Sequence, residues 1–169
     1  MEQIVVGMAD CRVADRPEQV LVTYALGSCI GLAIYDPQTK VGGLLHFMLP
    51  DSTIDPERGK ANPYMFADTG IPLLLQQLSG RGAVKRRLVV RAAGGAQMLD
   101  QENVFEIGKR NYLAMRKLLW KVGILVHAEA VGGMRSRTVR LELSTGRFWL
   151  SEGGEQTELV AGVPRKGGS

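Results

Sequence analysis

The spacing of apolar and polar positions predicts a chain made mostly of short strands. Apolar and β-branched residues gather in short runs separated by glycine, proline and other turn residues, as in a β-rich domain. The runs expected to form strands are residues 4–6, 20–23, 30–35, 41–48, 88–92, 124–131, 138–143 and 148–150.

Two longer stretches carry apolar residues at the spacing of a helix. The first, residues 62–78, begins with Asn62 as its N-cap and Pro63 at the first helical position. Pro72 lies inside this stretch, so we expect a kink or a break there. The second helix is expected over residues 107–122. Its apolar stripe consists of Tyr112, Met115, Leu119 and Val122.

Together these elements predict an α+β fold, in which a mainly antiparallel β-sheet is covered by two main helices. We expect a single domain over residues 1–151, because no linker, repeat or low-complexity block interrupts that stretch. Residues 50–60 are polar and rich in turn residues, which predicts an exposed loop. Residues 152–169 are rich in glycine and glutamate, which predicts a flexible C-terminal tail.

The composition is typical of a soluble globular protein. Of the 169 residues, 45% are hydrophobic and 22% are charged, which is enough to bury a core without disulfide bonds. The N-terminus lacks the pattern of a signal peptide, and no apolar run is long enough to span a membrane. With two cysteines, we expect a cytoplasmic protein without a disulfide framework.

The net charge of +4 suggests an affinity for something acidic. The densest basic stretch consists of Lys85, Arg86, Arg87 and Arg91, and it has no aromatic residues between its members for base stacking. We therefore interpret it as the solvated end of a strand, which could weakly steer an acidic protein partner. No nucleic-acid binding is expected.

The strands on either side of residues 36–39 should pair as a β-hairpin. If the turn is centred between Pro37 and Gln38, Cys29 lies opposite His46. Directly opposed residues on antiparallel strands have Cβ atoms about 5 Å apart. That distance is short enough for a hydrogen bond between the thiol and the imidazole.

The same pairing divides the hairpin into two faces. One face is apolar and should form the core. The other face carries mostly small residues, which would leave room for a ligand beside the cysteine and histidine. The core face holds Ile30, Leu32, Ile34, Val41 and Leu45, and the other face holds Cys29, Gly31, Ala33, Gly42, Leu44 and His46.

A paired cysteine and histidine suit nucleophilic catalysis. The imidazole of His46 would lower the pKa of the Cys29 thiol from about 8.5 and so supply the reactive thiolate. Gly27 and Ser28 can form a tight turn whose backbone N–H groups hold the oxyanion of a tetrahedral intermediate. Thr23, on what we take as the adjacent strand, could bond the far imidazole nitrogen and fix the tautomer of the ring.

The residue pattern alone also allows a structural interpretation. Buried cysteines are often inert parts of a core, and a histidine on a strand is often structural. No metal site is expected, because Cys11 and His127 show no ligand spacing. We interpret His127 as a structural residue of an apolar strand and Cys11 as unreactive.

Several sequence elements together resemble a known family. They are Thr23-Tyr-Ala-Leu-Gly-Ser-Cys29, Asp36-Pro37, Gly42-Gly43-Leu-Leu-His46-Phe-Met-Leu-Pro50, Tyr64-Met-Phe-Ala-Asp68, Gly94-Gly95-Ala96, Ile107-Gly108-Lys-Arg110-Asn111 and Gly132-Gly133. This combination extends over roughly residues 5–150 and resembles the chemoreceptor glutamine deamidases of the CheD family. The chain departs from the family at residues 134–137, where the family is closer to Asn-x-Gly-Arg, and at Ala93, where phenylalanine is common. These departures bear on partner affinity and loop shape more than on chemistry.

The resemblance implies a layered α/β sandwich with Thr23, Cys29 and His46 as catalytic residues. It implies hydrolysis of glutamine side chains on the cytoplasmic helices of chemoreceptors, the methyl-accepting chemotaxis proteins, to glutamate and ammonia. The reaction would proceed through a thioester, with no metal or cofactor. A CheC-type phosphatase is implied as a further partner, and no membrane insertion is expected.

Two other hypotheses fit the same sequence. A cysteine protease or a transglutaminase would need the same pair of Cys29 and His46. Alternatively, the chain would be an adaptor that binds chemoreceptors or a CheC-type phosphatase with little catalysis of its own.

Overall fold

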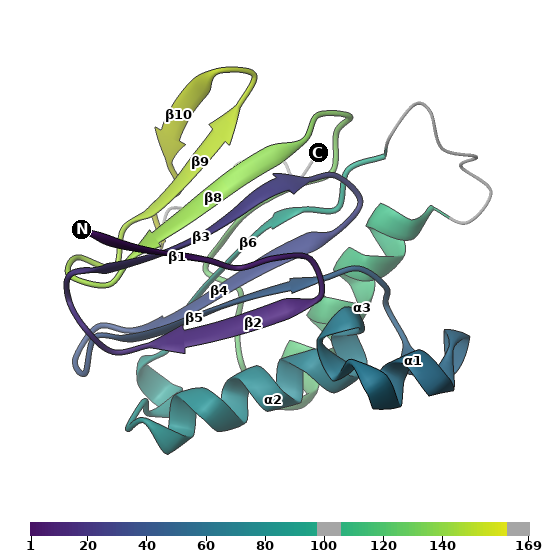
Figure 1. The fold of residues 1–169 in the computed structure, drawn as a ribbon, viewed down its shortest axis with the longest axis horizontal. Helices are drawn as coiled ribbons and strands as arrows, with labels where there is room; N and C mark the ends of the chain where they lie inside the picture. Colours follow the sequence, from purple (N-terminus) through teal and green to yellow (C-terminus); the bar gives the residue numbers. More distant parts are fainter. Residues whose placement is uncertain (98–105, 162–169) are drawn as a thin grey trace.

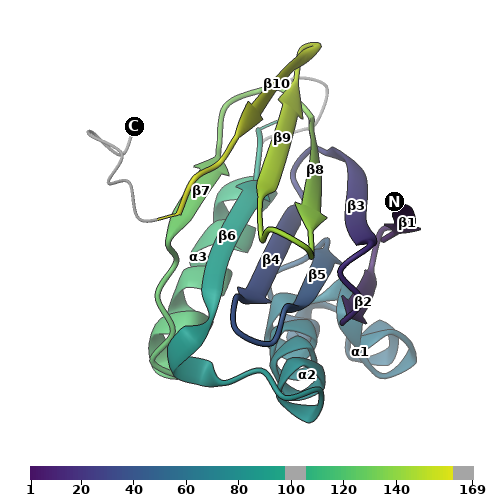
Figure 2. The same ribbon diagram turned by 90° about the vertical axis from the view of Figure 1, so that its left-hand side faces the viewer.

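The computed structural model describes residues 1–97 and 106–161. Within these residues the chain forms two five-stranded β-sheets packed face to face, and three α-helices cover the outer face of one of them (Figure 1). A view from the side shows the same layers, with α2 and α3 next to β4, β5 and β6 (Figure 2). The expected α+β sandwich with helices over a sheet is therefore confirmed.

We call the two sheets the outer sheet and the helix-covered sheet. Parallel pairs join β1 to β3 and β6 to β7, and the other paired strands are antiparallel. The outer sheet has the strand order β1 (Glu2–Val5), β3 (Gln19–Leu26), β8 (Arg137–Glu142), β9 (Phe148–Glu152) and β10 (Glu155–Glu158). The helix-covered sheet has the order β2 (Asp10–Ala14), β5 (Val41–Phe47), β4 (Ile30–Asp36), β6 (Val89–Gly94) and β7 (Ala128–Val131).

The helices are short, and none in the described part of the chain is both long and apolar enough to cross a membrane. The α-helices are α1 (Pro56–Ala61), α2 (Ala67–Gly80) and α3 (Ile107–Lys121). Single turns of 3₁₀ helix occur at η1 (Ser52–Ile54), η2 (Pro63–Met65) and η3 (Lys85–Arg87).

Each face of the helix-covered sheet borders its own hydrophobic core. On the helix side, the β4 and β5 residues predicted to face the core pack against α2 and α3. On the other side, the small residues of the hairpin pack against the outer sheet. The helix-side core includes Ile30, Leu32, Leu45, Ile71, Leu74, Met115 and Leu119, and the core between the sheets includes Leu21, Leu26, Ala33, Leu44, Leu141 and Phe148.

The face that we expected to be open is therefore covered. A Cβ atom on Gly31 would lie 2.9 Å from Cδ1 of Leu26 on β3, and one on Gly42 would collide with Leu143. Small residues on this face let the outer sheet approach the hairpin closely, so the prediction that they leave room for a ligand was wrong.

The pairing of β4 with β5 differs by two residues from the predicted register. Asp36 pairs with Val41, so the connecting loop consists of residues 37–40 in place of the predicted 36–39. Lys40 closes this loop with a positive φ of 59°, and its N–H donates to the carbonyl of Asp36 at 2.8 Å. As a result, His46 lies opposite Gly31 and Cys29 lies just before the start of β4. A shift of two residues keeps every side chain on its face, so the predicted division of the faces is confirmed.

Several segments differ from the sequence-based expectation, among them β2, which was not predicted as a strand. The predicted loop at residues 50–60 contains α1, whose start is capped by the Asp55 side chain accepting from the Arg58 N–H. The first predicted helix is divided at Phe66 into η2 and α2, whereas Pro72 lies inside α2 without ending it. Part of the predicted flexible tail forms β10, which pairs with β9.

The basic stretch near residue 85 is only partly a solvated surface. Arg87 forms an ion pair of 2.8 Å with the fully buried carboxylate of Asp36, which anchors η3 to the end of β4. Arg91 is 4% exposed and points between the sheets, where its guanidinium lies 5.5 Å from the centre of the Phe148 ring. These two charges serve the fold, so they are not available to steer a partner.

Candidate active site

Cys29 lies in the short loop that leads from β3 in the outer sheet to β4 in the helix-covered sheet, and it is half-buried. Three consecutive carbonyls of this loop accept hydrogen bonds. The carbonyl of Gly27 accepts from the Ala96 N–H at 2.8 Å, and that of Cys29 accepts from the Gly95 N–H at 2.8 Å. Between them, the Ser28 carbonyl accepts from the Asn111 side-chain amide at 2.9 Å. The cysteine therefore sits on a backbone that is held from one side.

The hydrogen bonds to these carbonyls also determine where the N–H groups point. In a trans peptide the C=O and N–H groups point in opposite directions, and the described residues contain no cis peptide bond. The N–H groups of Ser28 and Cys29 consequently point away from Ala96 and Asn111. No other described residue accepts a hydrogen bond from either group. Whether they hold an oxyanion, as expected for this turn, stays a prediction.

Glycines make the support of the loop possible. Gly94 has a φ of 111°, and a Cβ atom there would run into the carbonyl oxygen of Cys29. On α3, a Cβ atom at Gly108 would lie 2.5 Å from the carbonyl oxygens of Gly95 and Ala96. Only a residue without a side chain lets these three segments meet so closely.

His46 points from β5 into the space between the two sheets and is 1% exposed. Its Nδ1 lies 2.7 Å from the hydroxyl oxygen of Thr23. Thr23 is on β3 in the outer sheet, so the contact crosses from one sheet to the other. The expectation that the threonine is on a strand adjacent to the histidine was wrong, but the expected hydrogen bond is present.

The partners of Thr23 select one tautomer of the imidazole. The hydroxyl donates its single proton to the Val6 carbonyl at 2.7 Å, so it can only accept from His46. Nδ1 must therefore carry a proton, and Nε2 presents a lone pair. Nε2 is buried and has no hydrogen-bond partner among the residues described.

The same observation shows that the thiol of Cys29 does not bond the imidazole in this state. The predicted direct opposition of the two residues is replaced by a diagonal arrangement, in which Cys29 precedes the residue opposite His46 by two positions. Catalytic hydrogen bonds are often absent before a substrate binds.

Both groups of the pair are neutral at rest. Burial lowers the pKa of His46 to about 4, although the nearby Asp10 carboxylate acts in the opposite direction. Burial raises the pKa of the Cys29 thiol above its ordinary value, and its own backbone N–H opposes that shift. The predicted lowering of the thiol pKa is therefore not observed, and the arrangement suits a base that takes the thiol proton only during attack.

Two supports of the loop were not assigned a role from the sequence. The glycines Gly94 and Gly95, like Asn111, were noted only as parts of motifs. A signal for Asn111 was present, because it lies four residues before Met115 and eight before Leu119 on the buried face of α3. An amide at such an apolar position indicates a specific hydrogen-bonding task. Val122, which we placed on that face, is 38% exposed.

The other cysteine and histidine lie outside the site. Cys11 is in the helix-side core, and burial raises the pKa of its thiol to about 12. His127 accepts a hydrogen bond from the Val90 N–H at 3.0 Å. Within residues 1–97 and 106–161, no three His, Cys, Asp or Glu side chains come together as a metal site would require.

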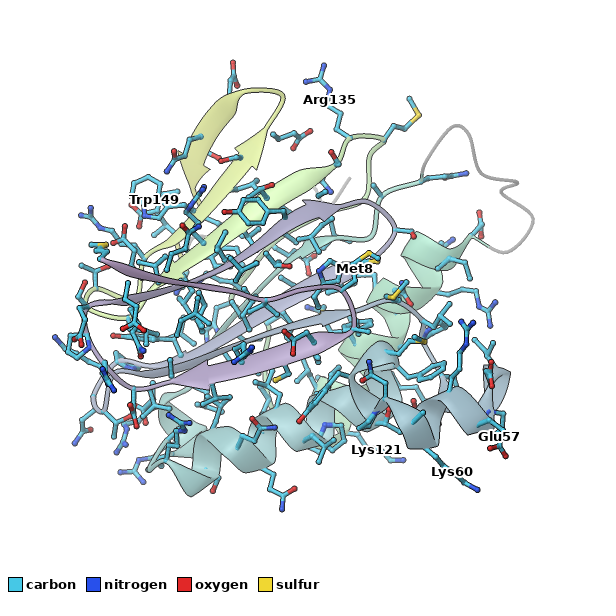
Figure 3. The ribbon with its side chains drawn as sticks, viewed as in Figure 1. Met8, Glu57, Lys60, Lys121, Arg135 and Trp149 are labelled. Atoms are coloured by element: carbon cyan, nitrogen blue, oxygen red, sulfur yellow. The ribbon has the colours of Figure 1, made fainter. Side chains whose placement is uncertain are left out.

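Exposed side chains surround the end of the molecule where β3 ends. Met8, in the turn between β1 and β2, is 64% exposed, and it lies at that end together with Arg135 (Figure 3).

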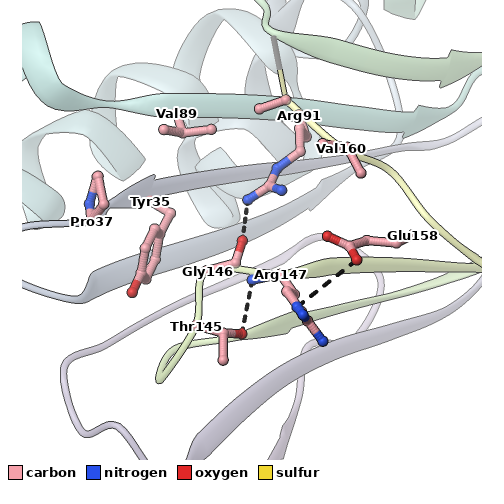
Figure 4. Close-up of a pocket in the computed structure, with 10 residues that line it drawn as sticks. Tyr35, Pro37, Val89, Arg91, Thr145, Gly146, Arg147, Glu158 and Val160 are labelled. Carbon is pink, nitrogen blue, oxygen red and sulfur yellow. Dashed lines mark hydrogen bonds and ion pairs between the residues drawn. The ribbon is translucent and has the colours of Figure 1, made fainter. Parts of the chain in front are cut away.

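A separate pocket of about 250 Å³ lies beside Tyr35, Arg91 and Gly146 (Figure 4). There the Arg91 guanidinium donates to the Gly146 carbonyl. None of the predicted site residues lines that pocket.

Comparison with known proteins gives consistent results. Residues 48–152 match the family model described as CheD chemotactic sensory transduction. A probable chemoreceptor glutamine deamidase CheD of Solibacter usitatus is 69% identical over 169 residues, which is the full length of both chains. A protein of the same description from Syntrophus aciditrophicus is 50% identical over 160 residues, covering 94% of this chain and all of the relative. A third, from Anaeromyxobacter dehalogenans, is 48% identical over 159 residues, again 94% of this chain and all of the relative.

Proposed function

The chain belongs to the CheD family, and we propose that it deamidates chemoreceptor glutamines with Cys29 as nucleophile, His46 as general base and acid, and Thr23 as the residue that orients the imidazole. It is a chemoreceptor glutamine deamidase, a hydrolase that acts in chemotaxis. The observation that carries the proposed roles is the hydrogen bond from His46 Nδ1 to Thr23, which leaves Nε2 unprotonated in a neutral imidazole.

The first chemical step forms a thioester. Nε2 of His46 takes the thiol proton while Sγ of Cys29 attacks Cδ of the glutamine side chain. The N–H groups of Ser28 and Cys29 hold the resulting oxyanion. The imidazolium then gives its proton to the amide nitrogen, the C–N bond breaks and ammonia leaves.

The second step hydrolyses the thioester. Nε2 of His46 removes a proton from a water molecule, whose oxygen attacks the same carbon. The C–S bond breaks, the proton passes to the departing sulfur, and the side chain leaves as glutamate. One water is consumed and one ammonia is released, so the chemistry of this chain balances with no further reactant.

The proposal extends to location and partners. We infer that the protein acts in the cytoplasm, because the receptor helices that it modifies lie there. A CheC-type phosphatase is the second partner that the family resemblance implies, and it would compete with the receptor for this protein. A competition assay would test this part: added phosphatase should slow deamidation of a receptor fragment.

Intact-mass analysis of a chemoreceptor cytoplasmic fragment tests the reaction and the nucleophile together. The wild-type protein should add one mass unit for each glutamine converted and release an equal amount of ammonia. Cys29→Ala should abolish both while the fold is retained. Cys11→Ala is the matched control, because it removes the other thiol from a different core, and it should retain activity.

Other outcomes identify the rival functions. Full activity of Cys29→Ala would remove the mechanism. A cleaved fragment would identify a protease, and a crosslinked product would identify a transglutaminase. Binding of the fragment by both proteins, without any mass change by the wild type, would identify an adaptor.

A further inference from the structure

Asn111 joins the two chain segments that carry the proposed catalytic pair. Its side chain is fully buried in α3, and its Nδ2 donates to the Ser28 carbonyl and to the Met48 carbonyl, each at 2.9 Å. Ser28 directly precedes the nucleophile Cys29, and Met48 follows His46 by two residues. One amide group therefore fixes the distance between the loop of the nucleophile and the end of the strand that carries the base.

The orientation of this amide is unambiguous. Turning it over would place Oδ1 of Asn111 against the two carbonyl oxygens, which can accept hydrogen bonds but cannot donate them. In the observed orientation Oδ1 is buried and has no hydrogen-bond partner in the described part of the chain. A buried acceptor without a partner costs stability, and such a residue calls for an explanation beyond packing.

The bond to Ser28 controls the peptide that joins Ser28 to Cys29. Because this peptide is trans, holding its carbonyl toward Asn111 directs the Cys29 N–H to the opposite side. That N–H is one of the two donors assigned to the oxyanion. On each side of it, the Gly27 and Cys29 carbonyls are held by backbone N–H groups, so Asn111 supplies the only side chain among the three bonds to this loop.

We propose that Asn111 is a positioning residue of the deamidase, which aims the Cys29 N–H at the oxyanion. This inference rests on the proposed function, because it assigns a role within the same site. Asn111 does not touch the substrate. It acts through the backbone of Ser28 and Cys29, and its removal should affect the steps in which an oxyanion forms.

Two reactions of the same thiol separate this role from a general structural one. Deamidation passes through an oxyanion. Alkylation of Cys29 by iodoacetamide is a direct displacement of iodide by sulfur, and no oxyanion forms. A residue that only kept the thiol in place would affect both reactions, whereas a residue that aims the oxyanion donor affects deamidation alone.

The test compares Asn111→Ala and Asn111→Ser with the wild type, using a receptor cytoplasmic fragment as substrate. We expect kcat for ammonia release to fall about 10- to 100-fold in Asn111→Ala, with KM unchanged. The smaller loss expected in Asn111→Ser follows from its hydroxyl, which still offers one donor. The rate of Cys29 alkylation should stay at the wild-type value in both variants when Cys11 has been replaced by alanine throughout.

Gln77→Ala is the matched control, because Gln77 also donates from a helix side-chain amide, to the Tyr64 hydroxyl at 2.7 Å. It should leave kcat unchanged. An unchanged kcat in a folded Asn111 variant would overturn the inference, as would a parallel loss of deamidation and alkylation. Failure of both Asn111 variants to fold would also overturn it, because the residue would then be required for the fold as a whole. Failure of the proposed function itself would be seen separately, as deamidation that persists in Cys29→Ala.

Discussion

Thr23 and His46 are joined by a hydrogen bond of 2.7 Å that crosses from one sheet of the sandwich to the other. The residues are brought together by the packing of the two sheets and not by the pairing of neighbouring strands. Since both are buried, the orientation of the imidazole depends on how closely the sheets approach. The core between the sheets is thus part of the catalytic arrangement.

Replacing Thr23 by valine should therefore impair catalysis more than binding. Valine has nearly the shape of threonine but lacks the hydroxyl, so Nδ1 of His46 loses its acceptor and the ring can adopt the other tautomer. We expect kcat for ammonia release to fall about 10- to 100-fold, with KM little changed. The Val6 carbonyl also loses a donor, so stability should fall by about 1–3 kcal/mol. Thr23→Ser keeps the hydroxyl and should retain most of the activity; equal kcat values in the valine and serine variants would contradict the role of this bond.

The buried His46 should make stability depend on pH in the weakly acidic range. Its pKa is lowered from 6.5 to about 4 in the folded protein, chiefly by burial. The unfolded chain binds a proton as the pH falls below 6.5, while the folded chain does not until about pH 4. The contribution of His46 to the free energy of unfolding is therefore fully present above pH 6.5. It is lost as the pH falls toward 4, and the total loss is about 3 kcal/mol.

Urea unfolding at pH 7 and at pH 4.5 measures this dependence. His46→Gln, which has no titrating group at this position, should show a smaller loss of unfolding free energy between the two pH values. The same loss in both proteins would show that other groups cause the dependence.

The thiol of Cys29 should not behave as a preformed thiolate. Because burial raises its pKa above the ordinary value, the rate of its alkylation by iodoacetamide should keep rising with pH through the neutral range and into the alkaline range. Cys11, whose pKa is raised to about 12 in the core, should stay unmodified in the native protein. Measuring the rate against pH in a Cys11→Ala background checks this, and a plateau already reached at pH 7 would point to a thiolate–imidazolium pair at rest.

The sequence was sufficient to predict which side chains share a face, but not which ones touch. Side chains alternate along a strand, so the faces of the hairpin followed from parity and survived an error of two residues in the register. The error arose at the turn, whose centre lies one residue further along the chain than we assumed. Asp36, which ends β4 there, contacts Val84 and Arg87, far along the chain, and such contacts cannot be seen in the local pattern.

The sequence did not show that the strands divide into two sheets, and the outer sheet changes the meaning of the small residues. Its last strand, β10, consists of exposed polar residues and lacks an apolar pattern. Without this sheet, Gly31 and Gly42 seemed to leave space for a ligand, whereas they accommodate Leu26 and Leu143. Long-range contacts of this kind have no local signal. For Asn111, the helix pattern indicates that an amide is buried but not that it contacts Ser28 and Met48.

Replacing Gly94 by alanine should disturb the nucleophile loop directly. Its φ of 111° is strained for any residue with a side chain, and the added Cβ would collide with the carbonyl oxygen of Cys29. We expect a loss of about 1–3 kcal/mol in the free energy of unfolding from strain at this position. Deamidation should fall as well, because the Cys29 carbonyl can no longer accept from the Gly95 N–H in its present position.

Gly80→Ala, at the end of α2 with nothing within 4 Å of the added Cβ, is the matched control and should stabilise the protein by up to about 1 kcal/mol. Thermal unfolding and ammonia release measured on both variants would decide the matter: a Gly94→Ala protein as stable and active as Gly80→Ala would show that the loop does not need this close approach.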